Sequence, residues 1–197
     1  MPKKGLFIVF EGIDGAGTTT QAKKLVNWLK SIGREAIYTC EPTGYLTGQI
    51  IRLVLKGAIK CSQRVLALLF AADRVYHLER KIKPAIEKGI IVVSDRYVLS
   101  SLAYQGVDLE ENWLREINKF AVKPDLTFYL DIEVEEAIKR MGSKSRDIFE
   151  NREMLHKIRE NYIRIISPKS GVIILDSSKP VEEVFKQVIQ EVSKLLV

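Results

Sequence analysis

Short runs of apolar residues alternate along the chain with longer segments in which apolar residues recur every three or four positions. The short runs predict strands, and the longer segments predict amphipathic helices. Residues 90–93 are all apolar, which is typical of a strand covered on both faces. The predicted strands are residues 6–10, 35–39, 90–93, 126–131 and 172–175.

The helical segments carry boundary signals as well as periodicity. Gly33 suits the position after a helix end, Ser62 suits an N-cap, and Pro84 suits a first helical turn that begins a short helix ended by Gly89. A polar stretch follows Asp95 before the next predicted helix. The predicted helices are residues 22–31, 47–56, 62–75, 84–88, 110–121, 134–141, 150–166 and 180–196.

Strands that alternate with helices predict an α/β fold, a doubly wound five-stranded parallel sheet with helices on both faces. We expect one domain over residues 1–197, because no repeat or linker interrupts the pattern. Ligands of such a sheet bind at the carboxyl ends of its strands.

Composition narrows the class of protein. The 197 residues are 46% hydrophobic and 28% charged, as in ordinary globular proteins, and the net charge is +6. The lysines are spread along helices rather than clustered with aromatic residues, so we expect no nucleic-acid partner. The positive net charge suits an anionic nucleotide as substrate. Cys40 and Cys61 form no metal pattern. The first apolar run is too short to span a membrane and lacks a signal-peptide pattern, which predicts a cytoplasmic protein without a membrane partner.

A glycine-rich turn stands between the first strand and the first helix. The spacing matches the phosphate-binding pattern G-x-x-x-x-G-K-[ST], with Gly12 and Gly17 as its glycines and Thr19 as its magnesium-binding hydroxyl. Thr18 occupies the lysine position, so one cation is missing. The alternative is a glycine turn without a ligand. The predicted ATP-binding residues of this loop are Gly12, Ile13, Asp14, Gly15, Ala16, Gly17, Thr18, Thr19 and Thr20.

Asp95 and Arg96 follow the buried third strand and should reach the same sheet edge. Asp95 can hold Mg²⁺ beside Thr19, and the Arg96 guanidinium can grip a second phosphate. An ion pair that closes the strand is the alternative.

Four segments together resemble the thymidylate kinase family, and the resemblance runs nearly end to end. It implies the doubly wound P-loop kinase fold. The segments are Phe10-Glu11-Gly12-Ile13-Asp14-Gly15, Glu41-Pro42-Thr43, Leu69-Phe70-Ala71-Ala72-Asp73-Arg74 and Asp95-Arg96-Tyr97-Val98-Leu99-Ser100-Ser101-Leu102-Ala103-Tyr104-Gln105-Gly106.

The resemblance implies transfer of the γ-phosphoryl group of Mg²⁺-bound ATP to dTMP, in dTTP biosynthesis. Phe70 would stack on thymine; the alternative is that it belongs to the hydrophobic core. Arg74 would bind a base carbonyl; the alternative is a surface ion pair with Asp73 or Glu79. Asp14 would hold the 3′-hydroxyl, unless it is only a turn residue. Tyr104 would lie beneath the sugar, unless its loop packs on itself. The implied substrate-binding residues are Asp14, Glu41, Phe70, Arg74, Arg96, Ser100, Tyr104 and Gln105, with Arg96 on the monophosphate.

A lid near residues 140–152 is also implied. In the family branch with glycine at the position of Gly15, lid cations act on the phosphates; here they would be Arg140, which binds ATP, and Lys144 and Arg146, which act in catalysis with Arg96. The alternative is a solvated charged loop. His77 and His156 lie on charged helical stretches, so we expect both to face solvent.

Two departures remove positive charge from the phosphate region, namely Thr18 and Cys40, the latter where many family members have arginine. Two alternative functions therefore stay open: a nucleoside monophosphate kinase of broader or different specificity, and a nucleotide-binding protein with impaired turnover. The resemblance also implies a homodimer formed through a helical face, to which residues 62–75 would contribute.

Overall fold

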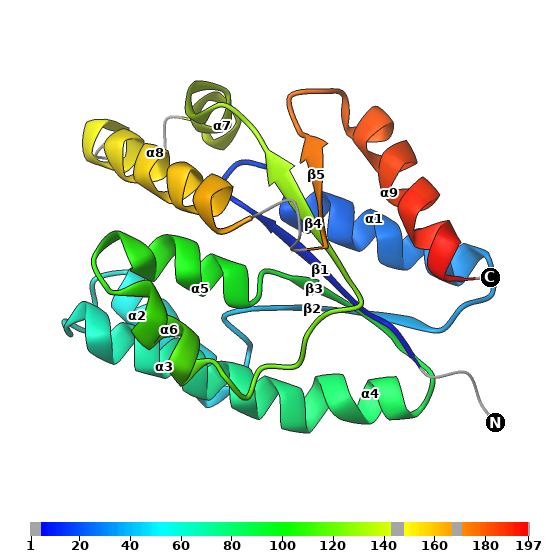
Figure 1. Cartoon of the computed structure of the whole chain (residues 1–197), viewed down its shortest axis with the longest axis horizontal. Helices are drawn as coiled ribbons and strands as arrows, with labels where there is room; N and C mark the ends of the chain where they lie inside the picture. Colours follow the sequence, from blue (N-terminus) through cyan, green and yellow to red (C-terminus); the bar gives the residue numbers. More distant parts are fainter. Residues whose placement is uncertain (1–4, 143–147, 167–170, 197) are drawn as a thin grey trace.

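A five-stranded sheet lies at the centre of the structure, a computed structural model that describes residues 5–142, 148–166 and 171–196 (Figure 1). The strand order is β2-β3-β1-β4-β5, and every neighbouring pair is parallel. The predicted α/β class and strand number are confirmed. The strands are β1 (Phe7–Gly12), β2 (Ala36–Cys40), β3 (Ile91–Asp95), β4 (Leu126–Asp131) and β5 (Val172–Asp176).

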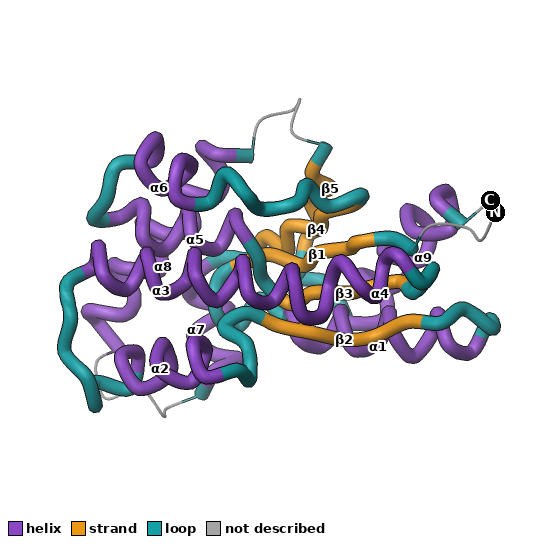
Figure 2. Tube along the Cα trace, turned by 90° about the horizontal axis from the view of Figure 1, so that it is seen from below, coloured by secondary structure: helices purple, strands orange, loops and turns teal. Residues whose placement is uncertain are grey.

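Helices cover both faces of this sheet, as Figures 1 and 2 show. None of the helices in the described residues is long and apolar enough to cross a membrane. The helices are α1 (Thr18–Ser31), α2 (Leu46–Leu55), α3 (Gln63–His77), α4 (Lys83–Glu87), α5 (Val98–Tyr104), α6 (Glu111–Ile117), α7 (Val134–Met141), α8 (Ile148–Ile165) and α9 (Val181–Leu195).

Alternate residues of β1 face different layers, because side chains of a strand point to opposite sides of its sheet. Ile8 and Phe10 belong to the core cluster that contains residues of α1 and α9. Phe7 and Val9 belong to a second cluster, with Leu78 and neighbouring residues of the helical segment before β3. All six residues of β1 are buried, so the strand that carries the glycine-rich turn is fixed on both sides.

Two helix boundaries follow the predicted chemistry. Gly33 lies after the end of α1 with φ 77°, and the Ser62 side chain accepts a hydrogen bond from the Val65 N–H at 3.3 Å at the start of α3. The Ser62 contact satisfies one of the backbone N–H groups that the start of a helix leaves unpaired.

The helix expected to begin near Pro84 is not separate. Helix α4 has Pro84 in its first turn, as predicted, but α3 continues through a π-helical turn, Leu78–Ile82, directly into it, and the pattern did not predict this continuity. Proline lacks an N–H group and its ring crowds the carbonyl four residues earlier. A wider turn just before Pro84 relieves that conflict and lets one long helix run on.

The polar stretch after Asp95 contains a helix that the pattern did not predict. Helix α5 buries Ser101, Leu102 and Ala103, and the next helix, α6, is shorter than the expected 110–121. Serine at core-facing positions hid the helical period of α5, because these hydroxyls serve the site rather than the core.

Candidate active site

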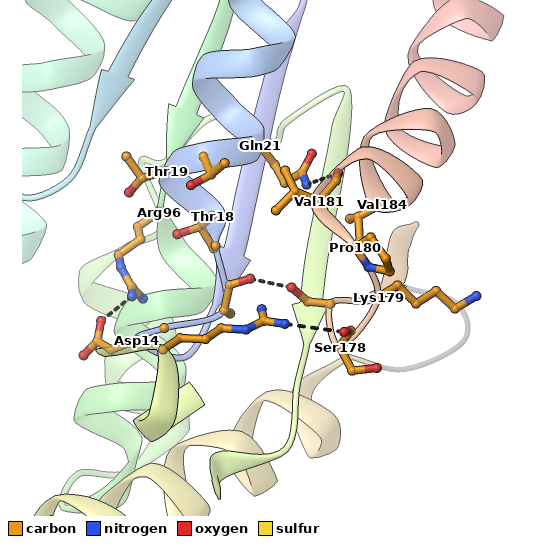
Figure 3. Close-up of a pocket in the computed structure, with 16 residues that line it drawn as sticks. Asp14, Thr18, Thr19, Gln21, Arg96, Ser178, Lys179, Pro180, Val181 and Val184 are labelled. Atoms are coloured by element: carbon orange, nitrogen blue, oxygen red, sulfur yellow. Dashed lines mark hydrogen bonds and ion pairs between the residues drawn. The ribbon is translucent and has the colours of Figure 1, made fainter. Parts of the chain in front are cut away.

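A cavity of about 720 Å³ lies beyond the carboxyl end of β1, between the start of α1 and the loop from β5 to α9 (Figure 3). Its wall consists of residues 14–21 and 177–181 together with Arg96, Arg140 and Val184. The Ser177 hydroxyl donates to the Ala16 carbonyl at 2.5 Å and joins the two loops. The N-terminus of α1 opens into this space, which makes it suited to an anion.

The glycines of the turn are required by its shape. Gly15 and Gly17 have φ values of 83° and 92°, a region that side chains disfavour. A Cβ atom on Gly15 would lie 2.5 Å from the Ala137 carbonyl oxygen of α7. The turn therefore has no room for a side chain at Gly15, and additional positive charge must come from other elements.

Thr18 is buried at the start of α1 and lines the cavity at the position where the pattern has lysine. The next two lysines do not replace it: Lys24 pairs with Glu182 at 2.7 Å, and the Lys23 ammonium lies 5.5 Å from the centre of the Tyr38 ring. Among the described residues, the cations that line the cavity are Arg96, Arg140 and Lys179. The predicted Lys144 and Arg146 lie outside the described residues.

Thr19 and Asp95 come together as the spacing predicted. The Thr19 hydroxyl donates to Asp95 Oδ2, and the Tyr38 hydroxyl donates to the same oxygen at 3.1 Å. Asp95 Oδ1 is buried without a hydrogen-bond partner among the described residues. One carboxylate and one hydroxyl suit Mg²⁺, which takes few protein ligands and completes its shell with phosphates and water.

Tyr38 was not predicted as part of this site. Burial and the adjacent Asp95 raise the pKa of its phenol, which stays protonated and able to donate. Its position two residues before the end of β2, beside a strand that ends in aspartate, was the available signal.

A second cavity of about 260 Å³ lies between α3, α5 and the loop after β2. Every predicted substrate-binding residue lines it, and Leu55, Pro42, Tyr97 and Ser101 complete its wall. Gln105 Oε1 is buried there without a hydrogen-bond partner among the described residues. Buried polar groups are normally satisfied, so this oxygen points to a ligand or water in this cavity.

Arg96 stands between the two cavities and lines both. Its guanidinium donates to the Gly12 carbonyl at 2.8 Å and to an Asp14 carboxylate oxygen at 2.5 Å, and it lies over the Tyr104 ring. Burial opposes its charge, but Tyr104, Asp14 and other neighbours outweigh burial and raise the pKa of Arg96. The positive charge of Arg96 therefore faces both cavities. Its φ of 71° is rare outside glycine and marks a strained backbone position.

Arg74 is buried rather than exposed, so the alternative of a surface ion pair was wrong. Its guanidinium donates to Glu41 Oε2 at 2.9 Å, to the Tyr97 carbonyl at 3.1 Å, to the Ser101 hydroxyl at 2.9 Å and to Asn118 Oδ1. Nη2 also lies 2.8 Å from Glu41 Oε2. Of the five N–H groups of a guanidinium, these contacts engage the one on Nε, both on Nη2 and one on Nη1. The second N–H of Nη1 has no partner among the described residues, and Arg74 lines the cavity.

His77 does not face solvent, which corrects the sequence-based expectation. Its side chain is fully buried, with Nδ1 3.1 Å from Glu41 Oε1 and Nε2 2.6 Å from the Thr39 hydroxyl. The charged residues around it in sequence, Glu79 and Arg80, are exposed, and this local polarity hid the buried face. His156 is part-exposed and lies 3.2 Å from Glu135.

Glu11, also missed by the sequence patterns as a site residue, is fully buried and bonds Tyr97 and Ser100, two residues that line the second cavity. It accepts hydrogen bonds from the Tyr97 N–H at 3.0 Å, the Ser100 hydroxyl at 2.5 Å and the Tyr162 hydroxyl at 3.1 Å. Burial raises the pKa of Glu11, against the contribution of the Ser100 hydrogen bond. Through these contacts Glu11 links α5, which carries the cavity, to α8.

Comparisons with known proteins agree with this arrangement. The family model described as thymidylate kinase matches residues 10–188. A probable thymidylate kinase from Methanococcus aeolicus is 47% identical over 193 residues, covering 94% of each chain. Proteins of the same name from Thermococcus kodakarensis and Methanocaldococcus jannaschii are 45% and 43% identical, and cover 97% and 93% of this chain and 98% and 94% of their own. The chain therefore belongs to the thymidylate kinase family, a family of phosphotransferases.

Proposed function

We propose that the protein transfers the γ-phosphoryl group of ATP to dTMP, giving ADP and dTDP in the biosynthesis of dTTP. The observation that carries this proposal is the placement of Arg96 on the shared wall of two cavities, one at a glycine-rich helix N-terminus and one lined by aromatic and polar side chains. Two phosphate groups bound in these cavities would meet at Arg96.

ATP is proposed to occupy the larger cavity. The backbone N–H groups at the start of α1 bind its phosphates, while Pro180, Val181 and Val184 offer an apolar surface for the base. Thr19 and Asp95 would hold Mg²⁺, and the unpartnered Asp95 Oδ1 supports this assignment. When bound, Mg²⁺ neutralises negative charge that develops on the transferred phosphoryl group.

The nucleoside of dTMP is proposed to occupy the smaller cavity. Phe70 presents a flat apolar ring for thymine, and the free N–H of Arg74 can donate to a base carbonyl. The unpartnered Gln105 Oε1 can accept from the ring N–H. Tyr104 lies against the sugar and leaves little room for a 2′-hydroxyl.

The contact between Arg96 and Asp14 suggests how the acceptor binds. In the free protein the Asp14 carboxylate is the anion on Arg96, at 2.5 Å. The dTMP phosphate would replace it, which frees Asp14 to accept a hydrogen bond from the 3′-hydroxyl. The phosphate oxygen then attacks the γ-phosphorus in line, and the protein contributes positioning and charge rather than covalent chemistry.

The phosphate site of the proposed enzyme lacks one positive charge, because Thr18 replaces the lysine of the pattern. Arg140 lines the ATP cavity, and we propose that the lid near residues 140–152 supplies the remaining cations through Lys144 and Arg146. The missing lysine also favours the second candidate function, a nucleotide-binding protein with little turnover.

The assembly is proposed to be a homodimer of single-domain chains in the cytoplasm. Helices α2 and α3 pack on each other and expose apolar side chains, among them Leu53, Val65 and Leu68. Such a surface suits a two-fold contact between copies.

A coupled assay for ADP release from ATP tests the function directly. Release that requires both dTMP and Mg²⁺ supports the kinase. Tight binding of both nucleotides without release, at micromolar enzyme, favours the binding protein instead.

A further inference from the structure

A line of buried polar side chains leads from the edge strand β2 to the smaller cavity. It runs from Thr39 to His77, then to Glu41, and ends at Arg74. All four side chains are buried, and only Glu41 and Arg74 line the cavity. His77 is thus one step removed from any molecule bound there.

The two oxygens of the Glu41 carboxylate have different partners. Oε1 lies 3.1 Å from His77 Nδ1, and Oε2 accepts from Arg74 Nε at 2.9 Å. A carboxylate only accepts hydrogen bonds, so His77 donates through an Nδ1–H group, while Nε2 faces the Thr39 hydroxyl. The two contacts together fix the rotation of the carboxylate, which holds the Nε edge of the Arg74 guanidinium while Tyr97, Ser101 and Asn118 hold its other sides.

The same stretch of α3 holds the rest of the loop after β2. The Asp73 carboxylate accepts from the Thr43 N–H at 2.7 Å and from the Thr43 hydroxyl at 2.6 Å. His77 lies one helical turn after Asp73, so the two residues grip opposite ends of this loop. The contact with Glu41 is the part of this arrangement that reaches the cavity.

We propose that His77 is a positioning residue for the acceptor nucleotide, which acts through Glu41 to aim the free N–H of Arg74 into the smaller cavity. This inference rests on the proposed function, because it concerns the site assigned to dTMP. His77 contributes no group to the larger cavity, so its effect should be confined to dTMP and absent from ATP.

Two substitutions separate positioning from space filling. The amide of asparagine can occupy the place of Nδ1 and keep the donor to Glu41, whereas the longer glutamine places its amide near Nε2 and keeps only the contact with Thr39. Glutamine is closer in volume to histidine, so a space-filling role predicts that His77→Gln is the milder change. A positioning role predicts that His77→Asn is the milder change.

Titration calorimetry with dTMP on the wild-type chain comes first, since no binding there would refute the proposed function rather than this inference. We then expect His77→Asn to bind dTMP within about threefold of wild type and His77→Gln to bind about tenfold more weakly, the scale of a lost hydrogen bond to a charged group. ATP affinity should be unchanged in both, and KM for dTMP should rise in His77→Gln with little change in kcat.

Thr39→Val is the matched control, because it removes a buried hydrogen bond from the same histidine without altering Glu41. It should weaken dTMP binding less than His77→Gln does. If His77→Gln does not fold, His77→Leu, which fills a similar volume and offers no donor to Glu41, takes its place and should show the same selective loss. Equal dTMP affinity in the Asn and Gln variants, or a matching loss of ATP affinity, would overturn the proposal.

Discussion

At the scale of single residues, the proposed function depends most on Arg96. Among the described residues, it is the cation that lines both cavities, and it holds a left-handed backbone conformation to do so. Its N–H donates to the Phe10 carbonyl at 2.8 Å, which ties this strained position to the strand before the glycine-rich turn. Strain kept at such a place is consistent with selection for the position of the guanidinium.

Arg96→Lys should therefore not be a conservative change. A lysine ammonium cannot reproduce the planar fork that contacts the Gly12 carbonyl and an anion at the same time. We expect kcat/KM for dTMP to fall by the equivalent of about 1.5–3 kcal/mol, the scale of a charged hydrogen bond. Steady-state kinetics measure it, and an unchanged kcat/KM would refute the role of Arg96.

Thr18→Lys tests the missing lysine. Thr18 lines the cavity, so a longer side chain can extend into the space of the phosphates without entering the core. We expect the fold to be unchanged by circular dichroism and kcat to rise about tenfold or more, as an added donor at developing charge should cause. A kcat equal to that of wild type would mean that other cations already meet this need.

At the scale of elements, much of the site could be predicted and some could not. The strand–turn–helix at Gly12 and the pairing of Thr19 with Asp95 followed from spacing, because parallel strands end at one edge of a sheet. The resemblance supplied the residues of the smaller cavity. Helix α5 escaped the pattern because its buried positions include Ser101, and the π-helical turn before Pro84 has no signal in apolar periodicity.

The buried networks were beyond sequence patterns for a different reason. His77 and Glu11 are bound by partners that are 36 to 151 residues away in the chain, so only the fold brings them together. Glu11 precedes Gly12 at a strand end, which indicated a place near the site. His77 stands beside exposed charged residues in the sequence, and this local polarity predicted a solvent-facing side chain where the structure has a buried one.

An ion pair between helix α8 and strand β4 gives a prediction about pH. Arg159 contacts both oxygens of Asp131, at 2.8 and 3.0 Å, and this contact lowers the pKa of Asp131. A carboxyl with a lower pKa in the folded chain stabilises it fully above the unfolded pKa of about 3.9. That stability is lost as the pH falls through the folded pKa.

Arg159→Gln should accordingly lower the free energy of unfolding by about 1 kcal/mol at pH 7, with the difference shrinking as the pH falls below the unfolded pKa of about 3.9 and through the lower folded pKa. Urea denaturation over this pH range measures it. A loss of the same size at every pH would show that the side chain acts through packing rather than through charge.

At the scale of the whole molecule, we expect a dimer formed through the exposed apolar side chains of α2 and α3. Light scattering at micromolar concentration should give twice the chain mass of 22.4 kDa. Leu68→Glu should shift the mass toward the monomer, whereas Ile174→Glu, which changes an exposed apolar residue on β5, should not. A monomer mass for the unaltered chain would contradict this surface assignment.

The central claim is that the smaller cavity selects dTMP as the acceptor of a phosphoryl group from ATP in the larger cavity. The most direct test is kcat/KM for dTMP against UMP, measured by ADP release with saturating ATP and Mg²⁺. We predict that dTMP is preferred by about tenfold or more, because Tyr104 crowds a 2′-hydroxyl and the apolar side chains Pro42, Leu55 and Phe70 of the smaller cavity accept the thymine methyl group. Turnover of UMP equal to or better than that of dTMP would contradict the account.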